Sequence, residues 1–412
     1  MPEVTSTLLI FVLVIACLLL SAEILARVWI RHDRRYFVRR PYYRYNFDML
    51  PAASYLLNSP IRTVINSDGE RGNEVPCSDG KLYRVLVAGG SFVECGVLTQ
   101  DQTWPALLEK TLHQHRASFG ADQVHVGNIG VSELDTHALS AILEKILPRY
   151  PQLDLLLLGT GFACAMRWLL DGAQPERGPS TMPKAERFAQ YPEMPLKWYP
   201  PSSTALYEIA RRVAYRYWDR TIELPQAGRR MIACRKRRAE SKGQHLSLMT
   251  DPSAMLLSME QGLRRAIDLA RTRTSRIILV RQPWFDKEHL TDEEEQSLWI
   301  GQVEKGLSES SWKFLSRPDL LRLLASVDQT VLRVAHDCQL ETIELQSVVR
   351  TRSGMFYDDF HLSEAGAAEV AIGVASEILS YEIANWSSTQ SAEADRKETS
   401  ARSLKPSPAA VR

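Results

Sequence analysis

Two short segments of this 412-residue chain contain residues that could together carry out nucleophilic chemistry. Ser91 follows the glycine pair Gly89-Gly90 directly after an apolar run, and Asp358 stands three residues before His361 near the C-terminus. That spacing can place the carboxylate on the imidazole ring, which then removes a proton from a serine hydroxyl. A serine exposed at a strand end, with an Asp-x-x-His far downstream, therefore predicts a serine esterase.

Elements of two kinds alternate along most of the chain, and they would have to position these residues. Short apolar runs predict strands over 85–88, 124–126, 155–158, 277–280 and 342–345. Apolar residues at helical spacing predict helices over 103–112, 139–146, 204–218, 255–271, 319–335 and 364–379. Strands that alternate with helices favour one α/β domain with a mainly parallel sheet. The sites of such domains lie at the carboxyl ends of the strands.

Three glycine-marked turns follow expected strands. They are Gly89-Gly90-Ser91, Asn128-Ile129-Gly130 and Gly159-Thr160-Gly161. Glycine lets backbone N–H groups approach a ligand closely, which suits an anion or an oxyanion. A phosphate-binding loop is only weakly indicated, because the first turn lacks G-x-G-x-x-G and no G-K-[ST] occurs in the chain.

These motifs resemble those of the SGNH (GDSL-like) hydrolase superfamily, specifically its bacterial members with an N-terminal membrane anchor. The resemblance covers roughly residues 66–378. Residues 89–96 look like the nucleophile block, 128–130 like the second block and 358–366 like the final block. Residues 66–72 resemble a segment that often precedes the domain in anchored members. The resemblance implies a flavodoxin-like three-layer α/β/α fold with a mainly parallel sheet.

The resemblance also implies a role for each site residue. Ser91 would be the nucleophile, His361 the base and then the acid, and Asp358 the group that orients the imidazole. Backbone N–H groups of Ser91 and Gly130 would stabilise the oxyanion. No metal and no organic cofactor is expected.

The third block departs from the family pattern. After its apolar run the family usually carries Gly-x-Asn, and the Asn amide donates to the oxyanion, whereas this chain has Gly159-Thr160-Gly161. Loss of one such donor costs about 3 kcal/mol in well-studied enzymes. The Gly161 N–H or the Thr160 hydroxyl could act instead. Gly161 could equally be structural, giving room to Phe162 or Trp168.

Two functions follow from the motifs. The first is a membrane-anchored serine esterase that hydrolyses or transfers short acyl groups, above all acetyl, on a carbohydrate or envelope glycoconjugate. Its partners would be an acylated small molecule or polysaccharide, the lipid bilayer, and a membrane acyltransferase or polysaccharide-assembly protein. The alternative is a catalytically weak SGNH-like scaffold or binding subunit of a polysaccharide-assembly complex. The missing Asn favours that alternative, while the retained Ser, His and Asp oppose it.

The charge balance gives no indication of a nucleic-acid partner. The formal net charge is +1, so no global field attracts nucleic acid. None is expected as a partner.

The N-terminus predicts a membrane anchor. Residues 8–20 are unbroken apolar sequence, and hydrophobic character resumes as far as Ile30, which gives roughly the 20 residues needed to cross a bilayer. Glu23 and Arg27 are one helical turn apart and can pair. No Lys or Arg precedes Leu8, unlike the basic start of a signal peptide. A single-pass anchor in the cell (inner) membrane is therefore expected.

The side of the membrane on which the domain lies is left open. Six arginines follow the span within residues 27–40, and the positive-inside tendency would put the domain in the cytoplasm. The resemblance implies the periplasmic side instead.

The chain is expected to divide into four parts. Residues 1–30 would be the anchor, 31–80 a juxtamembrane connector, 81–385 the hydrolase domain and 386–412 a disordered tail.

An insertion over 171–253 would border the cleft. Within it, Trp198 or Tyr199 could stack on a sugar, with packing in the core or a lid as the alternative. The basic stretch 229–242 is expected to be a solvated face, with contact to an anionic membrane as its alternative.

Overall fold

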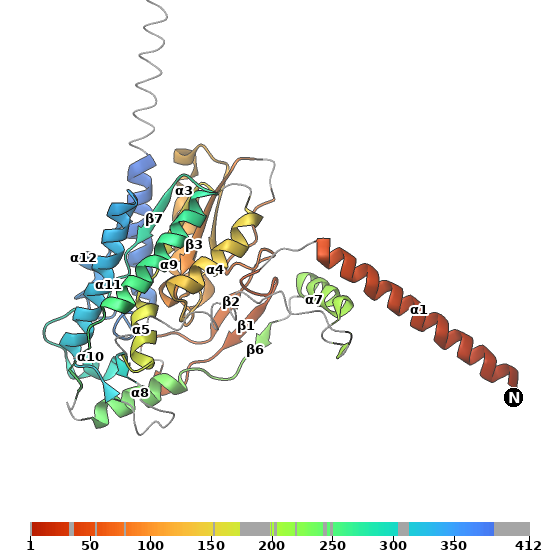
Figure 1. The fold of residues 1–412 in the computed structure, drawn as a ribbon, viewed down its shortest axis with the longest axis horizontal. Coiled ribbons are helices and arrows are strands. Elements are labelled where there is room, and N and C mark those ends of the chain that lie inside the picture. Colours follow the sequence, from red (N-terminus) through yellow and green to blue (C-terminus); the bar gives the residue numbers. More distant parts are fainter. Residues whose placement is uncertain are drawn as a thin grey trace, which may run out of the picture.

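A five-stranded parallel sheet forms the centre of the molecule in the computed structural model (Figure 1). Its strands are β3 (Leu82–Gly89), β4 (Gln123–Asn128), β5 (Leu155–Gly159), β7 (Ile277–Val280) and β10 (Glu341–Ile343). The spatial order β10-β7-β5-β3-β4 corresponds to 2-1-3-4-5 in chain order, which is the flavodoxin-like arrangement.

The structure describes most of the chain. The described residues are 2–32, 37–53, 56–77, 80–150, 153–173, 198, 200–201, 204–218, 221–241, 245–247, 250–303 and 313–382. The tail predicted at 386–412 lies outside them.

Alternate side chains of the central strands face two different helical layers. Leu86 and Ala88 belong to one hydrophobic cluster, whereas Val85 and Val87 belong to the other, as the twofold period of a strand requires. The first cluster includes residues of α4 (Thr136–Ile146), α5 (Phe162–Leu170), α9 (Ser253–Arg271) and α11 (Arg317–Asp337). The second includes residues of α3 (Trp104–Gln114), α12 (Gln346–Val349) and the helical segment 364–382. The predicted three-layer α/β/α fold is therefore confirmed.

The N-terminal helix leaves this body and is long and apolar. Helix α1 spans Pro2–His32, and Figure 1 shows it running away from the sheet with only its last turns beside the rest of the chain. Its segment Ser6–Trp29 contains an 18-residue window with a mean hydropathy of 3.0 and is long enough to cross a membrane. A membrane span and a signal sequence both have these properties.

The predicted connector and the predicted insertion meet in a second, small sheet. Strands β1 (Arg44–Phe47) and β2 (Ile61–Val64) pair antiparallel, and β6 (Ile222–Glu223) pairs parallel with β1. The insertion also supplies α7 (Ala205–Tyr217) and α8 (Arg229–Glu240). The remaining short elements are η1 (Pro51–Ala53), α2 (Ser91–Glu94), η2 (Gln100–Gln102), η3 (Arg116–Phe119), η4 (Leu147–Arg149), α10 (Asp292–Ser297), β8 (Gln302–Val303) and β9 (Lys313–Phe314).

The expectation that the basic stretch is a solvated face is wrong for two of its arginines. Arg238 is buried on α8 and donates to the Ile300 carbonyl at 2.6 Å. Arg235 donates to the carbonyls of Ser297 and Tyr357, at 3.0 and 3.2 Å. Because guanidinium groups can satisfy several buried carbonyls at once, part of this charge run serves packing.

Candidate active site

Ser91 stands at a sharp turn between a strand and a helix. Strand β3 ends at Gly89, and Ser91 is the first residue of the short helix α2. A Cβ on Gly89 would lie 2.0 Å from the Gly159 carbonyl oxygen, so only glycine allows the two chain segments to approach this closely. The turn places the serine at the carboxyl edge of the sheet, beside a cavity.

The three residues predicted as a triad meet there. Ser91 Oγ lies 2.8 Å from His361 Nε2, and His361 Nδ1 lies 2.8 Å from Asp358 Oδ2. Both contacts have hydrogen-bond length. The imidazole thus links a hydroxyl and a carboxylate that lie 267 residues apart in the sequence, in the order nucleophile, base and orienting group.

The Asp358 carboxylate is fixed from both of its oxygens. It is buried, and Oδ1 accepts the backbone N–H groups of Phe360 and His361 at 3.0 and 2.8 Å. Oδ2 is thereby aimed at the imidazole. The carboxylate can stabilise a positive charge on the ring without moving.

Asp359 follows the triad carboxylate directly in the sequence and lies inside the protein. It is buried, and burial raises the pKa of its carboxyl. Its Oδ2 accepts the N–H groups of Ile300 and Trp299, at 2.9 and 3.3 Å. Asp359 therefore fixes the loop that carries Trp299 to the site.

Aromatic rings surround the imidazole, and sequence patterns do not reveal most of them. Tyr357 and Trp299 lie nearly parallel to the His361 ring, with centroids 5.5 and 6.5 Å away. Phe360 lies tilted at 4.5 Å. Tyr357 and Phe360 adjoin the motif and could have been suspected, but Trp299 belongs to a distant loop without any signature. These rings hold the imidazole in one orientation.

The backbone N–H groups predicted to bind the oxyanion differ in their present partners. The N–H of Ser91 has no acceptor within its own helix, since Ser91 is the first residue of α2. The N–H of Gly130 donates to Asn128 Oδ1 at 2.9 Å, and its carbonyl accepts from Arg39. The predicted donation from Gly130 to an oxyanion stays a prediction that would require this bond to be shared or exchanged.

Gly161 faces the helical layer. Its φ is +133°, and a Cβ there would lie 2.8 Å from Val327 Cγ1 on α11. Val327 is the neighbour that requires its small size, whereas Val331 and Met259 would lie at ordinary contact distances of 3.6 and 3.7 Å. That Gly161 gives room to Phe162 or Trp168 stays a prediction. The Thr160 hydroxyl is buried and has no hydrogen-bond partner in the described part of the chain. Neither residue lines the cavity beside Ser91.

The cavity beside the triad has a volume of about 390 Å³. Ser91 and His361 line it together with apolar side chains and a polar rim. The apolar lining includes Met49, Phe92, Val97, Leu98, Met166, Leu170, Met231, Ile300 and Leu362. The polar lining includes Ser132, Glu133, Arg167, Asp171 and Arg230. Such a cavity has room for an apolar acyl group against its wall and a polar group at its rim.

The insertion borders this cavity, as expected, but Trp198 does not. Ala227, Gly228, Arg230 and Met231 of the insertion line it. The expectation that Trp198 stacks on a ligand in the cleft is wrong, because Trp198 lies against Arg27 of α1, with the guanidinium 4.2 Å from the ring centroid. Tyr199 lies outside the described residues.

A buried arginine supports the nucleophile turn from behind. Arg71 donates to the carbonyls of Glu94, Cys95 and Leu98, at 2.5, 2.9 and 2.5 Å. These residues end α2 and form the loop after it, so Arg71 ties down the chain that carries Ser91. The family-like segment 66–72 contains this arginine, but the motif alone does not indicate its role.

Comparisons with known proteins add a resemblance to solved structures. A scan against models of protein families and a search of curated proteins each found no match. An acetylxylan esterase from Geobacillus stearothermophilus is 14% identical, with 72% of this chain and 94% of that chain covered and a TM-score of 0.37. A member of the lipolytic G-D-S-L family from Veillonella parvula is 10% identical, with coverage of 71% and 95% and a TM-score of 0.35. The hydrolase LAE5 from the metagenome of Lake Arreo, Spain, is 11% identical, with coverage of 72% and 96% and a TM-score of 0.37.

The fold itself is assigned from the chain's own topology. The sheet is parallel with flavodoxin-like strand order, and helices cover both of its faces. A serine after the first strand of this sheet meets an Asp-x-x-His from the segment after the last strand. The chain therefore has a flavodoxin-like three-layer α/β/α fold, and this strand order and this meeting of side chains are those that the sequence resemblance to SGNH (GDSL-like) hydrolases implies.

Proposed function

We propose that this chain is a membrane-anchored serine esterase that hydrolyses or transfers short acyl groups, acetyl above all, on carbohydrate or envelope glycoconjugates. The observation that carries the proposal is the continuous hydrogen-bonded line from Ser91 through His361 to Asp358. It is supported by the cavity that these side chains share and by the apolar helix α1 at the N-terminus.

The reaction proceeds in two halves. Ser91 Oγ attacks the acyl carbonyl while His361 Nε2 takes its proton, and Asp358 stabilises the imidazolium. The tetrahedral intermediate collapses with return of that proton to the leaving alcohol, which gives an acyl-serine. A water, or an acceptor alcohol in the transfer reaction, then attacks the acyl-serine with His361 as base. Its proton returns to Ser91, and the acid or the new ester is released.

The oxyanion has fewer obvious donors here than in a site with a third-block Asn. The Ser91 N–H is the donor best supported by its position at the start of α2. Missing donors reduce the rate and leave the triad chemistry in place. We therefore expect slow turnover of activated esters, and this deficit is the one observation that favours the non-catalytic scaffold as a second candidate.

The test is hydrolysis of an aryl acetate by the full-length chain in an uncharged detergent. Ser91→Ala should lower the rate by at least about 10³-fold, to the background of the folded protein, and should abolish labelling by a fluorophosphonate. The control is Ser347→Ala, which removes an exposed serine of α12 outside the cavity lining and should keep both activity and labelling. No turnover and no labelling of well-folded wild-type protein would reject the esterase in favour of the scaffold.

A further inference from the structure

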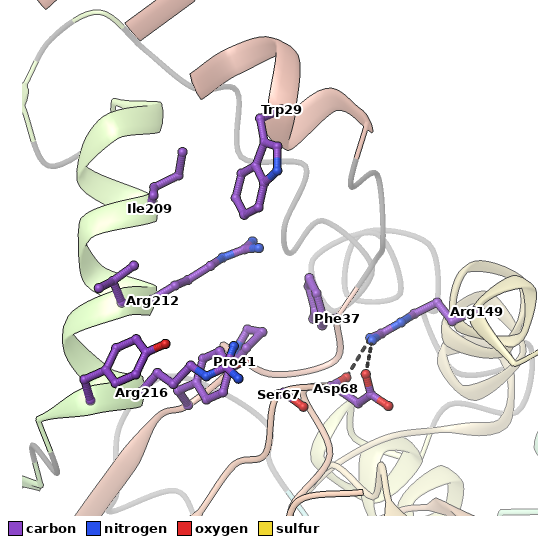
Figure 2. A pocket seen from close by; sticks show the side chains of 12 residues that line it. Trp29, Phe37, Pro41, Ser67, Asp68, Arg149, Ile209, Arg212 and Arg216 are labelled. Carbon is purple, nitrogen blue, oxygen red and sulfur yellow. Dashed lines mark hydrogen bonds and ion pairs between the residues drawn. The ribbon is translucent and has the colours of Figure 1, made fainter. Parts of the chain in front are cut away.

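A second cavity lies where the N-terminal helix meets α7, away from the triad. Its volume is about 320 Å³, which is within the range of small-ligand sites. Helix α1, the loop before β1, the turn before β3, the end of η4 and helix α7 all contribute to its lining. Its lining residues are Trp29, Phe37, Pro41, Tyr42, Ser67, Asp68, Arg149, Ile209, Arg212, Val213, Arg216 and Tyr217. Figure 2 shows this cavity.

Arginine side chains approach the cavity from two sides. Figure 2 shows Arg212 extending from α7 into the space between Trp29 and Phe37, with Arg216 below it and Arg149 opposite. Arg149 is held by Asp68, with Nη2 at 2.8 Å from the carboxylate. Arg216 lies over the Tyr217 ring at 5.7 Å and pairs with no carboxylate in the described part of the chain.

Two carboxylates near the cavity each bind two arginines of the described residues. Glu208 binds both Arg211 and Arg212, at 2.7 and 3.1 Å. Asp68 likewise binds Arg149 and also Arg84, the latter at 2.7 Å. Each of these two carboxylates therefore contacts two guanidinium groups, and Arg84 also contacts Glu70 at 3.4 Å. Planar guanidinium groups match the oxygens of a phosphate, and both Arg212 and Arg216 line the cavity.

The position of the cavity relates it to the bilayer. Glu23 of α1 accepts the N–H groups of Ala205 and Leu206, at 3.0 and 2.9 Å. This contact joins the end of the candidate span Ser6–Trp29 to the start of α7. A cavity lined by Trp29 therefore lies at the level where a spanning helix emerges from the hydrocarbon, which is the level of lipid phosphates.

The exposed aromatic side chains around the cavity fit the same environment. Tyr217 and Trp218 at the end of α7 are 72% and 66% exposed, and Trp29 is 54% exposed. Tyrosine and tryptophan are enriched at membrane interfaces, where a ring can lie among headgroups. Arginines beside them attract anionic lipids.

We propose that the cavity between α1 and α7 binds the phosphate headgroup of an anionic phospholipid, with Arg212 and Arg216 as its ligands and Trp29 and Tyr217 against the glycerol and upper acyl region. The bound lipid joins α7 to the end of the anchor and fixes the orientation of the domain on the membrane. The proposal is independent of the esterase activity, and it requires that α1 remain on the mature chain.

Native mass spectrometry of the full-length chain in uncharged detergent tests this, with phosphatidylglycerol, phosphatidylcholine and inorganic phosphate as probes. We expect one phosphatidylglycerol retained with at least tenfold preference over phosphatidylcholine. Arg212→Gln/Arg216→Gln should weaken its retention about tenfold, and Arg216→Gln alone by a smaller factor. The matched control is Arg265→Gln/Arg271→Gln, which changes two exposed arginines of α9 and should leave retention unchanged.

Four results would overturn the proposal. Equal retention of phosphatidylglycerol and phosphatidylcholine would mean that the cavity does not select anionic lipid. An equal loss in the α9 control would mean that overall charge governs binding. Inorganic phosphate that displaces the lipid at equal concentration would identify a free anion as the ligand. An intact mass that lacks α1 would remove a wall of the cavity. The single variant Arg216→Gln keeps the test valid if the double variant fails to fold, because Arg216 has no carboxylate partner to lose in the described part of the chain.

Discussion

The turn after β3 and the turn after β5 look alike in sequence and differ in what they serve. Both are glycine-rich, and both precede a helix at the carboxyl edge of the sheet. At Gly90 the φ is −84°, and a Cβ would have ordinary contacts at 3.7 and 3.9 Å. At Gly161 the φ is +133°, and a Cβ would meet Val327 at 2.8 Å.

The turn after β3 therefore positions a reactive side chain, whereas the turn after β5 allows two helices to pack closely. The first turn directs Ser91 toward the cavity and His361. The second lets α5 start against α11. An Asn in the conformation of Gly161 would direct its side chain toward α11. The absence of the third-block Asn therefore goes together with a different backbone conformation at Gly161 and is more than the loss of one side chain.

The comparison requires that Ser91, at the turn after β3, acts as a nucleophile with His361 and Asp358. The variant Asp358→Asn tests this and has the largest expected effect. An amide in place of the carboxylate favours the wrong imidazole tautomer and cannot stabilise the imidazolium. We expect kcat to fall by about 10³- to 10⁴-fold, measured as aryl acetate hydrolysis per folded molecule.

The neighbouring Asp359→Asn is the matched control for that change. Its carboxylate accepts backbone N–H groups, and an amide oxygen can accept them equally. We expect less than about a tenfold loss in rate. Similar losses per folded molecule in the two variants would show that Asp358 acts by fixing its loop, as Asp359 does, and not through the imidazole.

The second half of the comparison predicts a stability effect at Gly161. Gly161→Ala adds a Cβ against Val327 in a backbone conformation that L-residues disfavour, so the free energy of unfolding should fall by about 3 kcal/mol. Gly90→Ala, at a φ of −84°, should change it by less than about 1 kcal/mol. Thermal unfolding of both variants checks the contrast.

Val327→Ala decides whether the contact at Gly161 is the cause. In the background of Val327→Ala, the added Cβ at position 161 has room, so the double variant should recover part of the loss relative to the sum of the single changes. Strict additivity would instead assign the whole effect to the backbone conformation.

The sequence was sufficient for the framework of the fold because its strands are buried on both faces. All five expected strands occur within a few residues of their predicted positions, and β7 is exactly Ile277–Val280 as predicted. Strand β5 is an unbroken run of buried leucines before Gly159, the pattern of a central parallel strand. Local patterns of this kind need no knowledge of distant contacts.

Sequence predicts the site residues that lie within short local motifs and does not predict those that reach the site from distant segments. Ser91, Asp358 and His361 were found because their spacing reflects a local arrangement of each segment. Trp299 and Arg71 were missed as site residues because they reach it through long-range contacts. Gly161 was ambiguous because its φ and its contact with Val327 depend on how α11 packs.

Strand β4, which precedes the remaining glycine turn, contributes His125 to a buried charged cluster with Glu70 and Glu109, and this cluster extends the comparison to pH. Burial alone would lower the pKa of His125, but hydrogen bonds to Glu109 and Glu70 raise it to about 9. His125 Nε2 lies 2.8 Å from Glu70. Since its folded pKa lies above the ordinary value of 6.5, its contribution to stability is complete below pH 6.5 and is lost as the pH rises through 9.

Between pH 7 and pH 10 the free energy of unfolding should therefore fall by roughly 2–3 kcal/mol on account of this residue. Unfolding curves of His125→Asn should lack that component, while the exposed control His336→Asn should retain it. A wild-type stability that is flat over this range would contradict a charged His125. This alkaline loss must be separated from any pH dependence of the triad.

Substitution of Arg71, which binds the backbone after the β3 turn, has the smallest expected effect. It tests whether the β3 turn, unlike the β5 turn, must hold a side chain in an exact position. Arg71→Lys keeps the charge, but an ammonium cannot reach the three carbonyls of Glu94, Cys95 and Leu98 in the way a guanidinium does. Helix α2 should then hold Ser91 less precisely. We expect kcat and the rate of fluorophosphonate labelling to fall about tenfold per folded molecule, with KM little changed.

The control for Arg71 is a buried arginine at the opposite edge of the sheet. Arg276 stands directly before β7 and binds Glu341 and Glu382, at 3.0 and 2.5 Å. Arg276→Lys should lower the unfolding temperature without slowing the labelling of Ser91 in the folded fraction. If both variants slow labelling equally, the effect of Arg71 is one of general stability. If only Arg71→Lys slows labelling, the position of Ser91 depends on the hydrogen bonds from Arg71 to the backbone after the β3 turn. The turn at Gly161, which serves helix packing, has no such requirement.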